Sequence, residues 1–331
     1  MEGEEQKVAM DYEAKSRIVK ECLQDPERRL HLNASMAATI REEVYAHSLA
    51  RKLLLPRLIA KGHSPVFAEN SDGPIVMVNL VQKEQRVLRC RAFRDSLREE
   101  EVITSVRDID FVVMRGEAIR PASFPISNVC TLRWPDLNGN AYSMVERART
   151  RLKVVLATDE TKVMLRALAW VCRKFGQWIW APRAETCVEM LRRAIERVGP
   201  DKNPVVLTSM NTMMQIRGLQ SPDLGPKDVI QPIIAIRMVR VDERDYPVYF
   251  DAAIPDHRIY VVPSGESLGE MPIFTAPDVM DYDKPERLIK GWLCYQDQGM
   301  VFVNVKLTNT IYVGFRGLLD LLFGGFRKAS S

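Results

Sequence analysis

Histidines, cysteines and cofactor-binding motifs are the first places where this sequence could carry chemistry. The four histidines stand alone, and the six cysteines are far apart with no Cys-x-x-Cys pair, so neither set has the spacing of a zinc site. The patterns GxxxxGK[ST], GxGxxG and HExxH, which bind phosphate or dinucleotide or hold a metal, are all missing. We therefore expect no catalytic activity, no metal and no cofactor. The residues concerned are His31, His47, His63, His257, Cys22, Cys90, Cys130, Cys172, Cys187 and Cys294.

One acidic pair is close enough in sequence to bind a cation. Asp281 and Asp283 lie in the segment APDVMDYDKPER, whose two prolines and polar composition are typical of a turn. The pair could hold a cation or simply lie in a solvated loop, and we favour the solvated loop.

A second charged feature lies between two segments with alternating apolar residues. PIVMVNLVQ and IDFVVMRG are both rich in β-branched residues, which predicts two strands, and the segment between them is dense in charge. Since a two-stranded ribbon is barely stable alone, either a partner subunit covers it or it is an ordinary surface hairpin with a solvated charged face. The candidate contact residues are Arg86, Arg89, Arg91, Arg94, Glu99, Glu100 and Glu101.

A long helix with a basic surface follows over residues 140–174. Val145, Ala148, Leu152 and Val155 recur at spacings of three and four, which indicates one buried stripe. The remaining surface of this helix carries Arg147, Arg149, Arg151 and Lys153.

The elements that position these residues form a globular chain of mixed type. Of the 331 residues, 46% are hydrophobic and 27% are charged, which allows a sizeable core in one large or two modest domains. The net charge of +4 is too balanced for a dedicated nucleic-acid binder. An acidic start, unpaired cysteines and the lack of a long apolar run favour folding in a reducing cytoplasm without a membrane.

The order of the elements predicts an α+β fold. Residues 1–64 have a helical composition, with Asp25 and Pro26 at a helix start and an apolar stripe over 36–59 that ends at Leu58. This stripe is narrow, so the segment is either a solvated helical pair or an arm that packs on a neighbouring subunit. The strands of the charged hairpin follow, helices then dominate from residue 140 to residue 218, and strands with frequent prolines dominate the last third.

Four pieces of the sequence, taken in order, resemble the major capsid proteins of tailed bacteriophages. Residues 124–127 resemble their phenylalanine-containing strand, and 146–151 resemble the basic start of their long spine helix. Residues 203–218 resemble the strand and helix that open their axial domain, and 246–274 resemble that domain's hairpin and its Gly, Met-Pro-Ile turn at 269–273. Finally, Gly291, Trp292, Gly299, Met300 and Asn304 match a recurring pattern near the end of these proteins. The resemblance covers about residues 73–313.

This resemblance implies the Hong Kong 97-type capsid fold. It implies an N-terminal helical arm over 1–72, an extended hairpin loop over 73–120 and an axial domain over 186–274. The peripheral domain with the spine helix would comprise 121–185 and 275–331. The residue patterns agree with this fold, because a charged hairpin and a sparsely apolar arm both suit a lattice of repeated contacts.

The resemblance also implies partners and roles for residues. The chain would form hexamers and pentamers of an icosahedral head in the host cytoplasm and enclose double-stranded DNA. Expected partners are a portal protein, scaffolding and cement proteins, and packaged DNA bound without sequence specificity. The spine-helix residues Arg147, Arg149, Arg151 and Lys153 would contact either DNA or a neighbour's acidic hairpin. The alternatives are an encapsulin shell protein of the same fold, or a soluble enzyme whose site is scattered in sequence.

Overall fold

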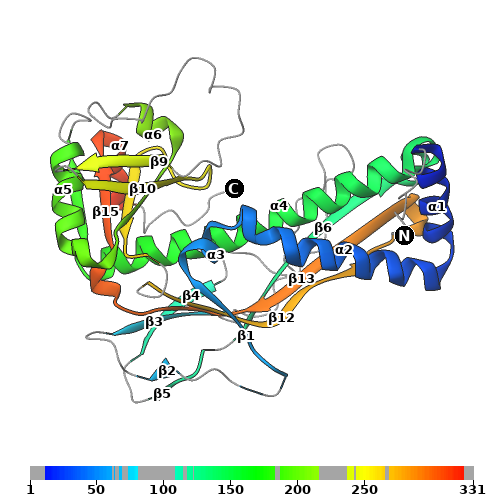
Figure 1. The fold of residues 1–331 in the computed structure, drawn as a ribbon, viewed down its shortest axis with the longest axis horizontal. Coiled ribbons are helices and arrows are strands. Elements are labelled where there is room, and N and C mark those ends of the chain that lie inside the picture. Colours follow the sequence, from blue (N-terminus) through cyan, green and yellow to red (C-terminus); the bar gives the residue numbers. More distant parts are fainter. Residues whose placement is uncertain are drawn as a thin grey trace, which may run out of the picture.

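We describe the fold from a computed structural model of the whole chain. The structure describes residues 12–61, 63, 67–68, 74–80, 109–114, 118–121, 123–182, 187–215, 237–241, 244–264 and 268–323. The molecule is elongated, with one sheet and its covering helices along the long axis and a second sheet at one end (Figure 1).

Helices begin the described chain, as the helical composition of residues 1–64 predicted, but there are three of them rather than a pair. They are α1 (Tyr12–Gln24), α2 (Pro26–His47) and α3 (Leu49–Leu53). Asp25 caps α2, since its Oδ1 accepts the Glu27 N–H at 3.0 Å and Pro26 occupies the first turn. The single helical stripe expected over 36–59 was wrong, because Ser48 interrupts it and caps α3. Leu58 then lies in the short strand β1 (Leu55–Leu58), where 76% of it is exposed.

The first sheet is built from strands that are distant in sequence. Its order is β4-β3-β14-β12-β13-β6, and β1 pairs in parallel with β12. β3 and β4 pair antiparallel from Ile75 with Met114 to Leu80 with Ile109, which confirms the predicted strand pair. The other bounds are β6 Phe124–Arg133, β12 Gly269–Asp281, β13 Ile289–Gln298 and β14 Met300–Phe302; β2 (Phe67–Ala68) and β5 (Ala118–Ile119) form a separate pair.

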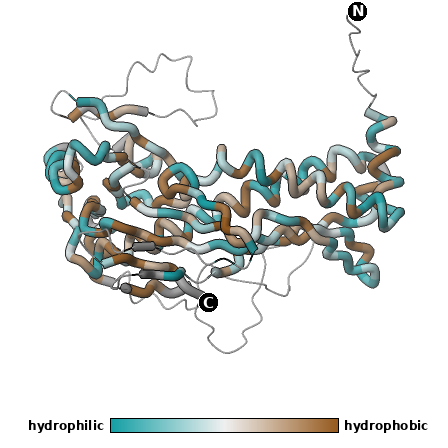
Figure 2. The backbone as a smooth tube through the Cα atoms, turned by 60° about the horizontal axis from the view of Figure 1, so that its bottom comes forward, coloured by the Kyte–Doolittle hydropathy of each residue, from teal (hydrophilic) through white to brown (hydrophobic). Residues whose placement is uncertain are grey.

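The helix α4 (Trp134–Lys174) runs along this sheet. It packs on β6 while α2 packs on β12, so both helices cover one face (Figure 1). The buried stripe includes Val145, Ala148 and Leu152, as predicted, and Figure 2 shows hydrophobic and hydrophilic residues alternating along these helices. The helix begins at Trp134 rather than near Asn140, where non-helical backbone angles mark a kink.

The second sheet forms its own core at the end of the molecule. Its order is β7-β15-β11-β8-β10-β9, and the helix α5 (Cys187–Val198) packs on one face against residues such as Ile179 and Ile311. The strands are β7 Trp178–Ala181, β8 Val205–Thr208, β9 Arg237–Val241, β10 Arg244–Phe250, β11 Arg258–Val262 and β15 Asn309–Val313. The remaining elements are α6 Met210–Gln215, α7 Gly314–Phe323 and the 3-10 turns Pro200–Lys202, Pro285–Arg287 and Val305–Leu307.

The two sheets divide the C-terminal part of the chain differently from our expectation. The resemblance predicts that 186–274 form one domain and that 275–331 belong with the spine helix. However, β12 begins at Gly269 in the first sheet, and β15 and α7 return to the second. The turn expected at 269–273 was also wrong, because these residues form the start of β12. Gly269 is needed there, since its φ is +150° and a Cβ would lie 2.0 Å from the Val301 carbonyl oxygen.

Candidate assembly interface

The charged residues of the hairpin loop lie outside the described residues. This applies to Arg86, Arg89, Arg91, Arg94, Glu99, Glu100 and Glu101. The structure describes the base of that loop, where β3 pairs with β14 on one side and β4 on the other. The contact role of the charged residues therefore stays a prediction.

The four basic residues of α4 fall into two groups with different surroundings. Lys153 pairs with Glu43 of α2, and the Lys153 hydrogen bond lowers the pKa of that carboxyl. Arg149 pairs with Glu146, three residues before it on the same helix. These two basic residues therefore neutralise carboxylates within their own subunit.

Arg147 and Arg151 are exposed along a different strip of α4. They line a shallow hollow of about 480 Å³ that runs along the helix. Its lining is Ser143, Glu146, Arg147, Thr150, Arg151 and Val154. Two of the four predicted basic contact residues thus lie on an open surface that can meet a phosphate backbone or an acidic neighbour.

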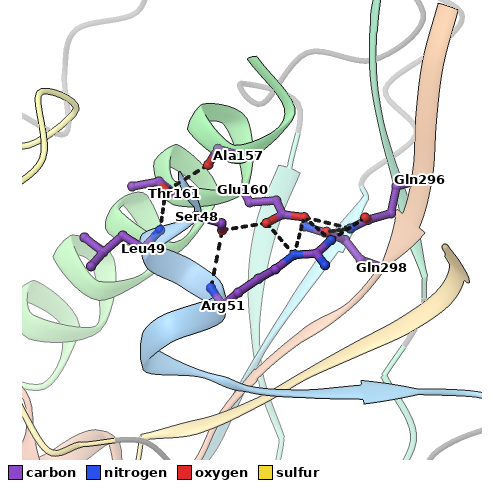
Figure 3. A network of polar contacts seen from close by, with 8 residues as sticks. All are labelled: Ser48, Leu49, Arg51, Ala157, Glu160, Thr161, Gln296 and Gln298. Carbon is purple, nitrogen blue, oxygen red and sulfur yellow. Dashed lines mark hydrogen bonds and ion pairs between the residues drawn. The ribbon is translucent and has the colours of Figure 1, made fainter. Parts of the chain in front are cut away.

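A buried polar network joins α3, α4 and β13 (Figure 3). The carboxylate of Glu160 is fully buried and accepts hydrogen bonds from Arg51 Nη2 at 2.8 Å, Ser48 Oγ at 2.6 Å and Gln296 Nε2 at 2.9 Å. Arg51 Nη2 also donates to Gln296 Oε1 at 2.6 Å, and Gln296 Nε2 reaches Gln298. Because each buried charge has several partners, the network fixes how the N-terminal segment sits on the spine helix and the sheet.

This network was not predicted from the sequence. Glu160 follows Leu152 and Leu156 at helical spacing, so it occupies the buried stripe of α4. A carboxylate on an apolar stripe was the available signal, because such a group needs a buried partner. The partner, Arg51, lies 109 residues earlier and could not be identified without the tertiary structure.

A second network corrects our interpretation of the acidic pair. Asp281 ends β12 and Asp283 follows it, and the buried Arg29 of α2 contacts both, with its Nε 2.8 Å from Asp281 and its Nη2 2.7 Å from Asp283. Lys290 also donates to Asp283, at 2.7 Å. Burial raises the pKa of Asp283, but the hydrogen bonds from Arg29, Lys290 and the Gly291 N–H outweigh it and lower that pKa to about 2. The prediction that this acidic pair lies in a solvated loop was therefore wrong. The positive charges beside the two carboxylates are the side chains of Arg29 and Lys290.

The Gly-Trp pattern of the sequence belongs to this second network. Trp292 is fully buried, and its indole N–H donates to Asn33 of α2 at 3.1 Å. Gly291 donates its N–H to Asp283, and a Cβ there would lie 2.4 Å from the Tyr282 carbonyl oxygen. These two residues therefore attach α2 to the end of the β12–β13 pair.

The described residues show no further chemical centre. Among them, no group of three or more histidines, cysteines or carboxylates could hold a metal ion, and no helix is long and apolar enough to cross a bilayer. Burial raises the pKa of the Cys130 and Cys172 thiols to about 11 and that of Cys294 to about 12, so these thiols stay protonated.

Comparisons with known proteins show the fold. No protein-family model matches the sequence, and no curated protein sequence matches it. A structure from Mycobacterium phage Adephagia matches with a TM-score of 0.50 at 8% identity, covering 80% of this chain and 90% of that one. One from Mycobacterium phage Bobi matches with a TM-score of 0.50 at 10% identity and the same coverage. The capsid structure of cyanophage P-SCSP1u gives 0.45 at 9% identity, covering 81% of this chain and 88% of that one.

The chain has an α+β fold of the Hong Kong 97 type, which is the fold of phage major capsid proteins. The long α4 beside the first sheet is the spine helix expected from the resemblance, and the second sheet stands at one end as a separate core. The expected fold class is therefore confirmed.

Proposed function

We propose that this chain is the major capsid protein of a tailed bacteriophage and forms the hexamers and pentamers of an icosahedral head that encloses double-stranded DNA. The observation that carries the proposal is the Hong Kong 97-type fold, matched over 80% of the chain by structures from two mycobacterium phages. The ordered resemblance over residues 73–313 supports the same function. In this proposal the chain acts by self-association and has no catalytic role or cofactor.

The proposed DNA contact is electrostatic. Arg147 and Arg151 lie on an open strip of α4, where guanidinium groups can approach phosphates without sequence specificity. A portal protein, scaffolding and cement proteins complete the proposed set of partners, and the virion capsid is the proposed location.

Sedimentation of the purified full-length chain tests the proposal. We expect megadalton particles, which electron micrographs show as closed shells, or the ring-shaped capsomers from which such shells are built. A monomer or small oligomer under all assembly conditions would contradict the proposal.

The contents of particles from the natural host test whether the shell is a phage head. Nuclease-resistant double-stranded DNA inside the particles is the expected result. Shells that instead hold a protein cargo and no DNA would identify an encapsulin-type compartment.

A further inference from the structure

A cluster of polar side chains interrupts the core where the end of α4 meets the second sheet. One face of this sheet is covered by α5, and the other packs towards α4, where Tyr260 and Val262 join the core of the first sheet. Thr310 pairs with Tyr260 in the register of β11 and β15, and Tyr312 lies two residues further, so both side chains lie on this second face. Thr310 and Tyr312 are both 0% exposed. Two hydroxyl groups are thus shut away from bulk solvent at this junction.

Neither hydroxyl has a strong hydrogen-bond partner within the described part of the chain. The Tyr312 hydroxyl is buried without a protein hydrogen bond. The Thr310 hydroxyl lies beside the Cys172 thiol, a weak hydrogen-bonding group that is also 3.6 Å from the Thr308 hydroxyl. Burying a hydroxyl without a partner is unfavourable, and nearly all such groups in native proteins bond either to protein or to ordered water.

Polar side chains of α4 and β11 lie near the Tyr312 hydroxyl. Arg258 places its guanidinium carbon 5.8 Å from the centre of the Tyr312 ring and donates to the Tyr260 hydroxyl at 3.0 Å. Burial raises the pKa of Tyr312 although Arg258 and Arg173 lower it, so the phenol keeps its proton and can both donate and accept a hydrogen bond. An apolar cavity stays dry, whereas a buried site with several polar partners holds an ordered water.

We propose that the Thr310 and Tyr312 hydroxyls share an internal water molecule at the junction of α4 and the second sheet. A water molecule donates and accepts at the same time, so one molecule can complete the hydrogen bonding of both hydroxyls. Hydrogen bonds through water are nearly as favourable in enthalpy as direct ones, and the entropy lost by holding the water is small beside the cost of an unbonded buried hydroxyl. The water thereby completes the joint between the spine helix and the second sheet.

A density map of the wild-type full-length chain that resolves ordered waters tests the site directly. We expect a peak within about 3.2 Å of both Tyr312 Oη and Thr310 Oγ1. A direct protein hydrogen bond to the Tyr312 hydroxyl would overturn the inference. So would the lack of a peak beside this hydroxyl in a map that shows internal waters elsewhere in the core.

The substitution Tyr312→Phe tests the water through the sign of its effect on stability. It removes only the hydroxyl and keeps the ring over which Arg258 lies. If water bonds the hydroxyl, the ratio of folded to unfolded subunit should fall about fivefold in urea titrations, the size of one hydrogen bond. If the hydroxyl has no partner, its removal should leave that ratio unchanged or raise it, and either result would overturn the inference.

The matched control is Tyr45→Phe. Tyr45 is 46% exposed, and Arg51 lies over its ring at 5.2 Å, so the control also removes a hydroxyl from a ring beside an arginine. Because bulk water solvates this exposed hydroxyl in the folded and unfolded chain alike, the ratio of folded to unfolded subunit should change less than about twofold.

A double-mutant cycle tests whether the two hydroxyls share one water. Thr310→Val keeps the shape of the side chain and removes its hydroxyl. If one water serves both residues, the loss in the double variant of Thr310→Val and Tyr312→Phe should be at least about twofold smaller than the product of the two single losses. Single losses that multiply independently would overturn the shared site. The full-length, unassembled subunit serves for this cycle, so its outcome does not depend on whether the chain forms capsids.

Discussion

Replacing Arg51 by methionine should destabilise the subunit more than any exposed charge substitution. The change leaves the fully buried Glu160 carboxylate with only Ser48 and Gln296 as donors, and it removes the donor to Gln296 Oε1. Breaking one partner of a buried ion pair typically costs about 3–5 kcal/mol, because the other charge stays buried without compensation. We expect a loss of this size in the free energy of unfolding.

Urea unfolding of the unassembled subunit, followed by tryptophan fluorescence and circular dichroism, measures this loss. The matched control is Arg28→Met, which breaks exposed ion pairs with Glu21 and Asp25 and should cost about 1 kcal/mol or less. The double variant Arg51→Met with Glu160→Leu should recover at least about 2 kcal/mol relative to Arg51→Met, since no buried charge remains. Equal losses for Arg51→Met and Arg28→Met would refute the reasoning.

Three further predictions concern acid stability, backbone strain and assembly. The pKa of Asp283, held at about 2, lies below its unfolded value, so its stabilisation is present above about pH 4 and disappears as the pH falls towards 2. Asp283→Asn should therefore lower stability by roughly 1–2 kcal/mol at pH 7 after allowance for partial exposure, and the difference should vanish in thermal scans near pH 2. Leu288 has φ of +53° and is 62% exposed, so Leu288→Asn should raise the unfolding free energy by about 0.5–1 kcal/mol in urea titrations; a loss would show that the leucine packing matters more than the strain. The double variant Arg86→Glu and Arg89→Glu should stay soluble but form no shells, and normal particles in electron micrographs would contradict this.

Local sequence patterns predicted most of the elements. The cap formed by Asp25 and Pro26, the apolar stripe of α4 and the alternating residues of β3 and β4 each depend on nearby residues, and the structure confirms them. The wrong predictions concern segments whose local sequence pattern is compatible with two different structures. The apolar spacing over 36–59 continues across Ser48, but a serine that caps a new helix turns the chain into β1. The prolines near Asp281 suggested a turn, but β12 continues because β13 pairs with it and Arg29 neutralises its acidic end.

The sequence by itself determined the α+β class, the cap of α2 and the apolar stripe of α4, because periodicity and caps are short-range properties. The tertiary structure decided which charges meet. Arg51 with Glu160, and Arg29 with Asp281 and Asp283, are joined across more than a hundred residues by packing. The tertiary structure also decided which basic residues of α4 stay open. Lys153 lies on the side of the helix that faces α2 and pairs with Glu43, whereas Arg147 and Arg151 lie on another side and line an open surface. The burial of the Thr310 and Tyr312 hydroxyls could be recognised only once the structure showed which face of β15 packs towards α4.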